Sequence, residues 1–478
     1  MELSGERPYG YKWRSSRSLV VSTACIALFA ETLLYSFLAP ILPYMLEVRL
    51  HGDPSQTQDL ITRLLSLHGF MTLISTPFVA AFSDSTATRR TPLLTYLAVC
   101  IIGTVLVAAS PTIWALYLGR VLQGIAGAGA WIAGMAMLTE NVDEGSIGKM
   151  MGLCMSFVMF GVISGPIIAG ALLELAGYWL AWSVPLVVLL IDVIMRFVMI
   201  EPEKGVSENK KNDTSVTEGL LGQREDTADT DTESSPLLSP KPGADAESTQ
   251  PQAQTVEDDA PSGGFYTIML RDGRVLASLL CVTTFSTITA GFNATFPVHL
   301  RQIFNWGPFP VGVAFFAMRS PSILLGPLSG SLRDRIGLRD PTTAGWSLFA
   351  PLLLCMGVPG EFPWSSAETH GKAIFVASII GIGIVQNLLQ NAGFLNILVV
   401  VQEYEFKYPK IFGANGGRGR AFGLTEMSFN MGLIVGPILS GSLSQVIGFF
   451  YMNAILGLIC IGNAVAVFST FAGRKQRG

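Results

Sequence analysis

Charged residues are scarce in this chain of 478 residues, because Asp, Glu, Lys and Arg together make up 14% of it. Soluble domains carry about 25%. The charge is also unevenly placed, since 15 of the 35 acidic residues lie within residues 201–264. The rest of the chain falls into apolar runs of about 20 or more residues, each long enough to cross roughly 30 Å of hydrocarbon as a helix. The composition therefore excludes a soluble enzyme.

Reactive groupings are also missing. The six cysteines each stand alone inside an apolar run, with no CxxC or Cys/His spacing, which argues against a metal site or a disulfide framework. No Ser/His/Asp, Cys/His or phosphate-loop arrangement is present. We therefore expect no enzyme activity, no metal and no cofactor.

Twelve apolar runs predict an all-α membrane protein. They lie at about 19–46, 60–82, 92–110, 113–137, 148–172, 178–200, 274–300, 309–332, 342–359, 372–402, 420–443 and 447–472. The segments between them fall alternately on two sides, one with 23 Lys and Arg residues and the other with 4. Basic residues resist translocation, so the rich side is predicted to be cytosolic, with both termini on it.

Residues 201–264 lack apolar periodicity and are rich in Ser, Thr, Pro and Asp. Such a segment buries too little surface to order itself, so we predict a disordered acidic cytosolic linker. It separates an N-terminal half, 1–200, from a C-terminal half, 265–478. Within it, Leu237 and Leu238 follow an acidic residue in the pattern that sorting adaptors bind, although such patterns are common in linkers.

Proline, glycine and charged residues recur at the same spacing in the two halves. Pro77, Asp84 and Arg89 recur 250 residues later as Pro327, Asp334 and Arg339. Residues of the fifth run recur 271 residues later in the eleventh: Gly161, Gly165, Pro166 and Gly170 match Gly432, Gly436, Pro437 and Gly441. An internal duplication of six helices is indicated. Parallel repeats suit alternating access around a site near the midplane.

The segment Gly330-Ser-Leu-Arg-Asp-Arg-Ile-Gly-Leu-Arg339 resembles the loop motif of the major facilitator superfamily. The resemblance implies the major facilitator fold: twelve helices in two pseudo-symmetric halves. The first-half copy is degenerate, with Ala80 and Ala87 in place of glycines. We assign gating to the residues of both copies: Asp84, Arg89, Arg90, Gly330, Asp334, Arg335, Gly337 and Arg339.

Two further motifs support this resemblance. Leu118-Gly-Arg120-Val-Leu-Gln123-Gly resembles the fourth-span motif of the superfamily, and Arg120 and Gln123 join the gating assignment. A charge inside an apolar helix is costly unless it faces the bundle interior or a wet cavity; snorkelling to the interface is the alternative. The fifth-span glycines with Pro166 resemble the motif of proton-coupled antiporters, where glycines four apart permit close helix packing.

The first and eleventh runs are similar to those of vesicular amine transporters. Glu31 stands nine residues before a Pro-x-x-Pro, and Glu426 precedes Gly436 and Pro437; these relatives have Asp at both places. The sequence departs elsewhere, because the relatives' other intramembrane charges align near Phe296, Gln386 and His68.

Glu31 and Glu426 are the predicted proton-coupling residues. A carboxyl group in an apolar medium favours its protonated form, whereas a nearby cation or water favours the ionised form. Such a group can exchange a proton for a substrate. Tyr35 and Asn430 lie one turn beyond the two acids on the same helix faces and are assigned to substrate binding.

Uncharged amides gather in the tenth run at Gln386, Asn387, Gln390, Asn391 and Asn396. Spacings of four predict polar stripes on one helix, serving either a substrate or helix–helix contact. We assign Gln386, Gln390 and Asn391 to the substrate site, together with Asn293. Arg319 is assigned there too, either paired with Glu426 or binding an acidic substrate group.

Two other polar features are interpreted separately. Asp192 and Arg196, four apart at the end of the sixth run, are expected to form a pair that reaches the membrane interface. His68 either assists proton relay, given the titration range of histidine, or is a satisfied interior residue.

The leading hypothesis is a proton-coupled antiporter that exports a small organic, cationic or amphipathic molecule from the cytosol. A carrier of a neutral or acidic metabolite using Arg319 is the alternative, and a non-transporting membrane sensor is a weaker one. We expect a functional monomer in the lipid bilayer of the plasma membrane or of a vacuole or vesicle, with protons and a small substrate as partners and no nucleic acid.

Overall fold

The computed structural model describes residues 11–85, 90–141, 147–200, 263–362, 370–408, 411–412 and 417–471, apart from a few side chains. Every regular element among these residues is a helix. The segment 201–262, with nearly all of the expected linker and both Leu237 and Leu238, lies outside the described residues.

The first half contains six long helices. After the short α1 (Tyr11–Arg14) come α2 (Arg17–Tyr44) with its π-helical end Met45–Arg49, α3 (Thr57–Ser85), α4 (Arg90–Ala109), α5 (Ile113–Asn141), α6 (Ile147–Leu175) and α7 (Tyr178–Val198). A 3-10 turn, Pro54–Gln56, leads into α3. Each helix coincides with one predicted apolar run to within about three residues at most ends.

The second half repeats this order with two interruptions. It contains α9 (Phe265–Arg271), α10 (Gly273–Phe304), α11 (Pro308–Arg319), α12 (Pro321–Ile336), α13 (Arg339–Gly357), α14 (Lys372–Leu389), α15 (Ala392–Lys407), α16 (Arg418–Ile447) and α17 (Phe449–Thr470). Helices α11 and α12 form the eighth run, and α14 and α15 form the tenth.

Eleven helical segments among the described residues are long and apolar enough to cross a membrane. The run expected at 342–359 is α13, which falls short on composition because its first turns carry Arg339, Asp340, Thr342 and Thr343. It nevertheless packs against α14 and α17 as a member of the bundle.

The tenth run was predicted as one helix with polar stripes, and this is wrong. The backbone leaves the helix at Gln390, and Asn391 takes a left-handed conformation with φ 62° before α15 begins. Asparagine tolerates this conformation better than most residues, because its short side chain can bond locally. Gln390 and Asn391 therefore do not continue the face of Gln386 and Asn387.

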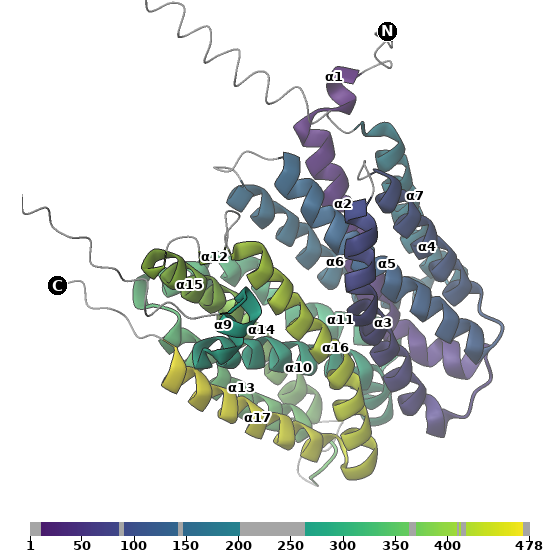
Figure 1. Cartoon of the computed structure of the whole chain (residues 1–478). Helices are drawn as coiled ribbons and strands as arrows, with labels where there is room; N and C mark the ends of the chain where they lie inside the picture. The colour runs from purple at the N-terminus through teal and green to yellow at the C-terminus, as the bar shows by residue number, and fades with distance from the viewer. Residues whose placement is uncertain are drawn as a thin grey trace, which may run out of the picture. The chain divides into compact units, whose positions relative to one another are not determined.

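Within each half the same helix pair packs most closely. Helix α2 lies along α6, and α10 lies along α16 (Figure 1). In the first pair, Thr32 Oγ1 donates to Val158 O at 3.2 Å. In the second, Ser286 Oγ donates to Phe429 O at 2.7 Å. These two hydrogen bonds occupy equivalent places in the repeat.

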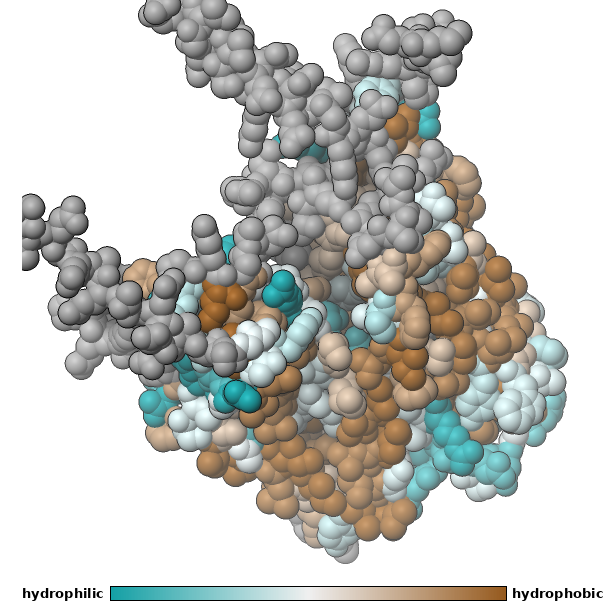
Figure 2. Space-filling view, in the orientation of Figure 1, coloured by the Kyte–Doolittle hydropathy of each residue, from teal (hydrophilic) through white to brown (hydrophobic). Residues whose placement is uncertain are grey.

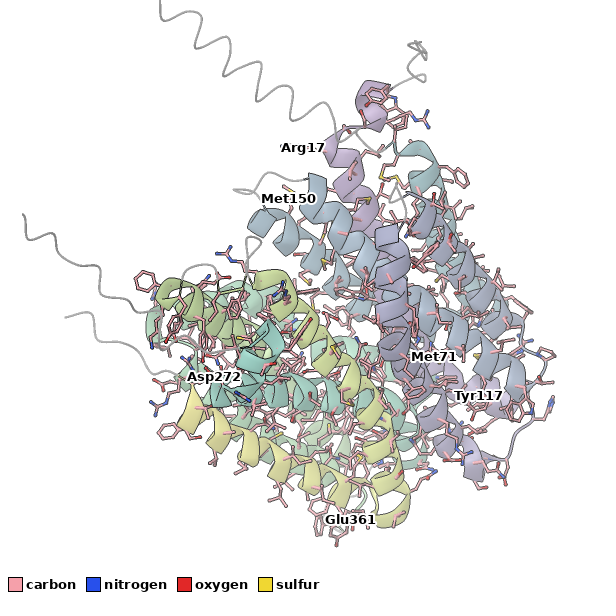
Figure 3. The ribbon with its side chains drawn as sticks, viewed as in Figure 1. Arg17, Met71, Tyr117, Met150, Asp272 and Glu361 are labelled. Atoms are coloured by element: carbon pink, nitrogen blue, oxygen red, sulfur yellow. The ribbon has the colours of Figure 1, made fainter. Side chains whose placement is uncertain are left out.

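The halves meet through α3 with α16 and α6 with α11. Small residues allow the approach, since a Cβ on Gly170 would lie 2.2 Å from Pro308 O, and one on Gly441 would lie 1.9 Å from Thr62 Oγ1. Arg17 and Met150 mark one end of the helices, and Tyr117 and Glu361 mark the other (Figure 3).

The helices expose large apolar side chains over wide areas (Figure 2). Examples are Leu324 at 81%, Phe78 at 72% and Leu458 at 72% exposed. Soluble monomers rarely expose contiguous apolar patches larger than a few hundred Å². This surface is that of a multi-pass helical membrane protein.

The interior of the second half is aromatic. Phe296, with no exposed area, stacks on Phe292 at 4.6 Å between ring centroids and lies within 6 Å of Phe315 and Phe375. These rings belong to three helices, α10, α11 and α14. They fill the place where the amine transporters were expected to carry an acid.

Candidate functional site: a charged interior in the first half

Glu31 lies in the middle of α2 with 8% of its surface exposed. Its Oε1 atom is 3.8 Å from His68 Nε2 on α3. On α5, a Cβ at Gly127 would lie 2.5 Å from the same oxygen, so a larger residue there would displace the carboxyl group. The carboxyl group is therefore held between three helices of the first half.

His68 connects Glu31 with Tyr35. The rings of His68 and Tyr35 are 5.3 Å apart between centroids, so both residues on the α2 face meet the same imidazole. Among the described residues, the Tyr35 hydroxyl and His68 Nδ1 are buried without a hydrogen-bond partner. Two unsatisfied polar atoms beside a buried acid are costly unless water or a ligand completes them.

Arg120 lies in the same interior and does not snorkel, since only 1% of it is exposed. Its guanidinium donates to Gln123 Oε1 at 2.9 Å and, through Nε, to Leu64 O at 3.4 Å. Gln123 Nε2 in turn donates to Thr104 Oγ1 at 3.1 Å. The positive charge of Arg120 acts on both Glu31 and Tyr35. The structure thus places the fourth-span motif beside the acid, inside the half.

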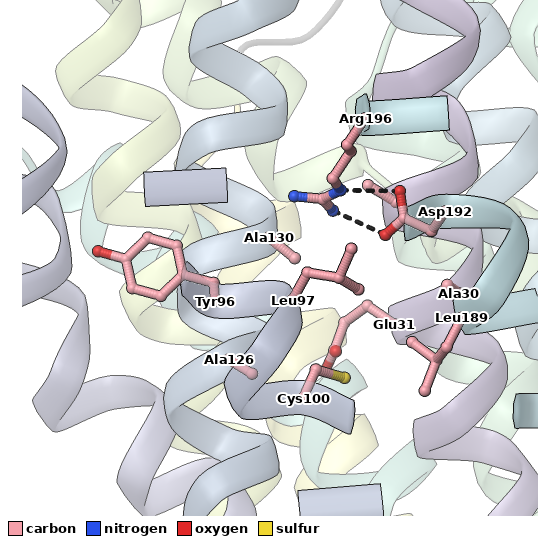
Figure 4. A pocket seen from close by; sticks show the side chains of 11 residues that line it. Ala30, Glu31, Tyr96, Leu97, Cys100, Ala126, Ala130, Leu189, Asp192 and Arg196 are labelled. Atoms are coloured by element: carbon pink, nitrogen blue, oxygen red, sulfur yellow. Dashed lines mark hydrogen bonds and ion pairs between the residues drawn. The ribbon is translucent and has the colours of Figure 1, made fainter. Parts of the chain in front are cut away.

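A small cavity of about 20 Å³ continues from Glu31 into the first half (Figure 4). Four helices line it with Ala27, Ala30, Glu31, Tyr96, Leu97, Cys100, Ala126, Ala130, Leu189, Asp192 and Arg196. The Glu31 side chain points toward Cys100, and the pair Asp192 and Arg196 lies at the other end.

The expectation that Asp192 and Arg196 reach the membrane interface is wrong. They are 1% and 3% exposed and form a bidentate ion pair, with both N–O distances at 2.8 Å. Arg196 also donates to Leu93 O on α4 at 2.7 Å. The face of α7 that carries them turns into the bundle, which hydropathy along one helix does not reveal.

A second polar group lies between the halves. Tyr35 is close to the Asn293 amide of α10 and within the electrostatic reach of Arg319 of α11. Arg319 ends α11, where Ser320 and Pro321 interrupt the eighth run. The structure thus brings together three of the residues assigned to substrate binding, from both halves.

The expected pair of Arg319 with Glu426 does not form. Among the described residues, neither side chain has a hydrogen bond or an ion pair, and the Tyr35 phenol lies near Arg319. Glu426 lies on α16, where Asn430 Nδ2 donates to its backbone oxygen at 3.0 Å. Both charges are thus left open to a ligand.

The amides of the tenth run mostly join helices. Gln386 donates to Met318 O at 2.9 Å and to Ser322 Oγ at 3.2 Å, both in the eighth run. Asn396 donates to Ser278 Oγ of α10 at 2.9 Å. Gln390 instead crosses to the first half and donates to Met159 Sδ at 3.1 Å. The exposed Asn391 marks the break between α14 and α15.

Sequence reasoning missed the role of Arg333. Its Nη2 donates to the backbone oxygens of Asn387 at 2.7 Å and Gln390 at 2.8 Å. The guanidinium thus caps the broken end of α14, where a positive charge is favourable. The only sequence signal was its position inside the second loop motif, where it was not among the residues assigned to gating.

A bridge between the halves was also missed. Arg301, near the end of α10, forms a bidentate ion pair with Glu47, at 2.5 and 2.6 Å, and Thr57 Oγ1 donates to the same carboxylate at 2.7 Å. Nearby, Gln58 donates to Ala294 O at 3.0 Å, and the backbone N–H of Phe309 donates to Glu174 at 3.0 Å. These contacts lie at the helix ends opposite the termini.

The repeated glycines lie where helices approach most closely. A Cβ on Gly161 or Gly165 would lie 2.3 Å from Thr32 Oγ1 or 2.2 Å from Ser36 Oγ, both on α2. On α16, a Cβ on Gly432 would meet Ser286, and one on Gly436 would meet Thr287 O, both on α10. Pro166 and Pro437 lie inside these helices.

The loop motifs are partly outside the described residues: Arg89, and the side chains of Asp84, Arg90 and Asp334. Of the others, Gly337 has φ 91°, which favours glycine, and ends α12. The Arg339 guanidinium lies 4.0 Å from the centre of the Phe468 ring on α17. Arg335 is exposed, and a Cβ on Gly330 would meet nothing within 4 Å.

The family model of the Major Facilitator Superfamily matches residues 24–397. An uncharacterised MFS-type transporter of Schizosaccharomyces pombe is 27% identical over 97% of this chain and 98% of its own. A synaptic vesicular amine transporter of Bos taurus is 21% identical over 85% of this chain and 66% of its own. The crystal structure of a D-xylose–proton symporter, 11% identical, covers 96% of this chain and 98% of its own with a TM-score of 0.66, which shows the same fold.

Proposed function

The chain belongs to the major facilitator superfamily of secondary transporters, and we propose that it is a proton-coupled antiporter that exports a small organic, cationic or amphipathic molecule from the cytosol. That it is a transporter and not an enzyme agrees with its relatives and its fold. The coupling proposal rests on Glu31. This buried carboxyl group lies beside His68 and forms no ion pair with a lysine or arginine among the described residues.

The chemistry follows from the setting of that carboxyl group. Glu31 has an imidazole at 3.8 Å and the charge of Arg120 nearby, but neither donates a hydrogen bond to it. A small change in its surroundings therefore shifts the balance between its charged and neutral forms. In alternating access, rocking of the halves supplies that change, and Glu426 offers a second carboxyl group on the opposite half.

Substrate is expected between the halves, near Tyr35 and Asn293. The halves are joined at the ends opposite the termini by Glu47 and Arg301. A site reached from the terminus-bearing side, which the basic residues assign to the cytosol, suits loading of an exported molecule. The vesicular amine transporter among the relatives favours a cationic substrate and a vesicular or vacuolar membrane.

Reconstituted transport tests this proposal. Purified protein in proteoliposomes is given an imposed pH difference and a panel of radiolabelled amines, neutral metabolites and organic acids. We expect accumulation of an amine that stops when a proton ionophore collapses the gradient. Accumulation that is insensitive to the ionophore would remove proton coupling.

A second candidate is a carrier of an acidic or neutral metabolite. The observation that favours it is Arg319, which lies between the halves with no ion pair among the described residues. A carboxylate on the substrate would satisfy it bidentately. In the same assay, this candidate predicts transport of an organic acid that Arg319→Gln abolishes, with Arg319→Lys retaining part of it.

A further inference from the structure

The cavity beside Glu31 lies entirely within the first half. Its lining comes from α2, α4, α5 and α7, and no residue of the second half contributes to it. The space between the halves, where Tyr35 approaches Asn293 and Arg319, is therefore a different place. Glu31 borders the cavity, while Tyr35, one turn further along α2, faces the other half.

The far end of the cavity is charged. Asp192 and Arg196 are buried there as an ion pair, and burial of two charges costs several kcal/mol each before their attraction offsets it. Replacing such a pair with apolar residues is often neutral or stabilising. Stability alone therefore gives a weak reason for a charged pair at this position.

Other ionisable groups lie near Glu31 or line the cavity that it borders. These are His68 on α3, Cys100 and Tyr96 on α4, Arg120 on α5, and Asp192 with Arg196 on α7. A cavity of about 20 Å³ accommodates a single water molecule, which needs two to four polar partners. The Glu31 and Asp192 carboxyl groups and the Cys100 thiol line this cavity and are candidate partners.

We propose that this cavity conducts the coupled proton between Glu31 and Asp192, so that protons and substrate use separate routes through the first half. The proposal rests on the proton coupling proposed above. In the transfer, the Glu31 O–H gives its proton to the oxygen of a cavity water, and that water gives one of its own protons to an Asp192 oxygen. One proton moves from Glu31 to Asp192, and no group is oxidised or reduced.

The geometry explains how two routes remain coupled. Glu31 and Tyr35 lie one turn apart on α2 and share His68 between them. A substrate that displaces Tyr35 acts through His68 on the carboxyl group. Asp192 lies six residues before the end of α7 at Val198, on the terminus-bearing side, and Arg196 bonds the first turn of α4 there. The route thus leads from the middle of the half toward that side.

Filling the cavity tests the proposal. Ala126, 1% exposed, lines it; Ala133, 0% exposed on the same helix, does not. We expect Ala126→Val to slow pH-driven accumulation in proteoliposomes at least tenfold and to leave substrate-for-substrate exchange within twofold of the unchanged protein, because exchange moves no net proton. Ala133→Val, the matched control, retains both activities.

A second variant guards against misfolding of the first. Asp192→Leu combined with Arg196→Leu removes the charges while keeping the interior packed, and we expect the same tenfold loss of accumulation with exchange retained. Infrared difference spectra after a pH jump measure protonation of Glu31 directly. The carboxyl band of Glu31 is identified by its absence in Glu31→Gln, and it should appear more slowly in both variants.

The outcomes distinguish the proton-coupling role of Glu31 from the proton route through the cavity. If Glu31→Gln accumulates substrate as well as the unchanged protein does, the proposed role of Glu31 fails. If Glu31→Gln loses accumulation but Ala126→Val and the double Leu variant keep it and protonate Glu31 at the normal rate, the route through the cavity is overturned while proton coupling stands.

Discussion

The two halves share their helix contacts and differ in what they enclose. Thr32 with Val158 in the first half and Ser286 with Phe429 in the second form the same hydrogen bond between the same pair of helices. The interior of the first half, however, contains Glu31, His68, Arg120, Asp192 and Arg196, whereas that of the second is built around phenylalanines.

The duplicated halves therefore share the contacts between their helices, but they do not share the side chains that line their interiors. The contacts at Gly161, Gly165, Gly432 and Gly436 tolerate little change, because a Cβ at any of them would meet backbone atoms of the neighbouring helix. Side chains inside a half are replaced more freely as long as they fill the space or find partners. The proton route proposed here therefore lies in the first half, and the second half contributes Glu426 within a mainly packed interior.

The largest effect is expected from a substitution in the aromatic interior of the second half. Phe296→Ala removes the ring at the centre of four aromatic contacts and should lower the free energy of unfolding by about 3–5 kcal/mol. Thermal unfolding in detergent measures it. Protein that does fold should still show a pH-dependent transport rate. Phe296→Leu, which keeps most of the volume, serves as the control; an equal loss in both variants would argue against a packing role.

The next effect tests the charged side. Glu31→Gln keeps shape and hydrogen bonding but cannot release a proton, and should reduce pH-driven accumulation at least tenfold, about 1.4 kcal/mol or more, with unfolding temperature unchanged. Glu426→Gln is the matched change in the second half. It should lower accumulation less, because the proposed proton route adjoins Glu31 and not Glu426. Equal losses would show that both halves contribute alike.

A smaller effect concerns the bridge between the halves. Arg301→Gln breaks the ion pair with Glu47, whose side chains are 36% and 14% exposed, and should shift the balance of open and closed states by about 1 kcal/mol, or fivefold. Labelling of a cysteine placed at Gln58 reports the opening. The charge swap of Glu47→Arg with Arg301→Glu should restore the original labelling. If it does not, the Glu47–Arg301 ion pair does not control the opening.

The smallest effect is expected at the broken helix of the second half. Arg333→Gln removes the cap on the backbone oxygens of Asn387 and Gln390 and should cost about 1 kcal/mol of stability. Arg333→Lys should recover part of it, since the charge at the helix end remains. Hydrogen exchange at residues 386–392 is the measurement, and unchanged protection would show that the cap is unimportant.

The helices, their order and their duplication could be predicted from the sequence alone. Hydropathy and glycine spacing act within one helix or between homologous helices, so the runs at 60–82 and 148–172 predicted α3 and α6 closely. The intramembrane acids Glu31 and Glu426 were also identifiable, because a carboxyl group in an apolar run stands out in any arrangement.

The contact partners of those residues became known only from the tertiary structure. The rotation of α7 about its axis turned Asp192 and Arg196 into the bundle, and the break at Asn391 ended the polar stripe expected in the tenth run. The approach of α5 placed Gly127 against Glu31, and the approach of the halves joined Glu47 to Arg301. Such contacts depend on how several helices pack together, and the sequence of one helix does not show which residues of another helix will face it.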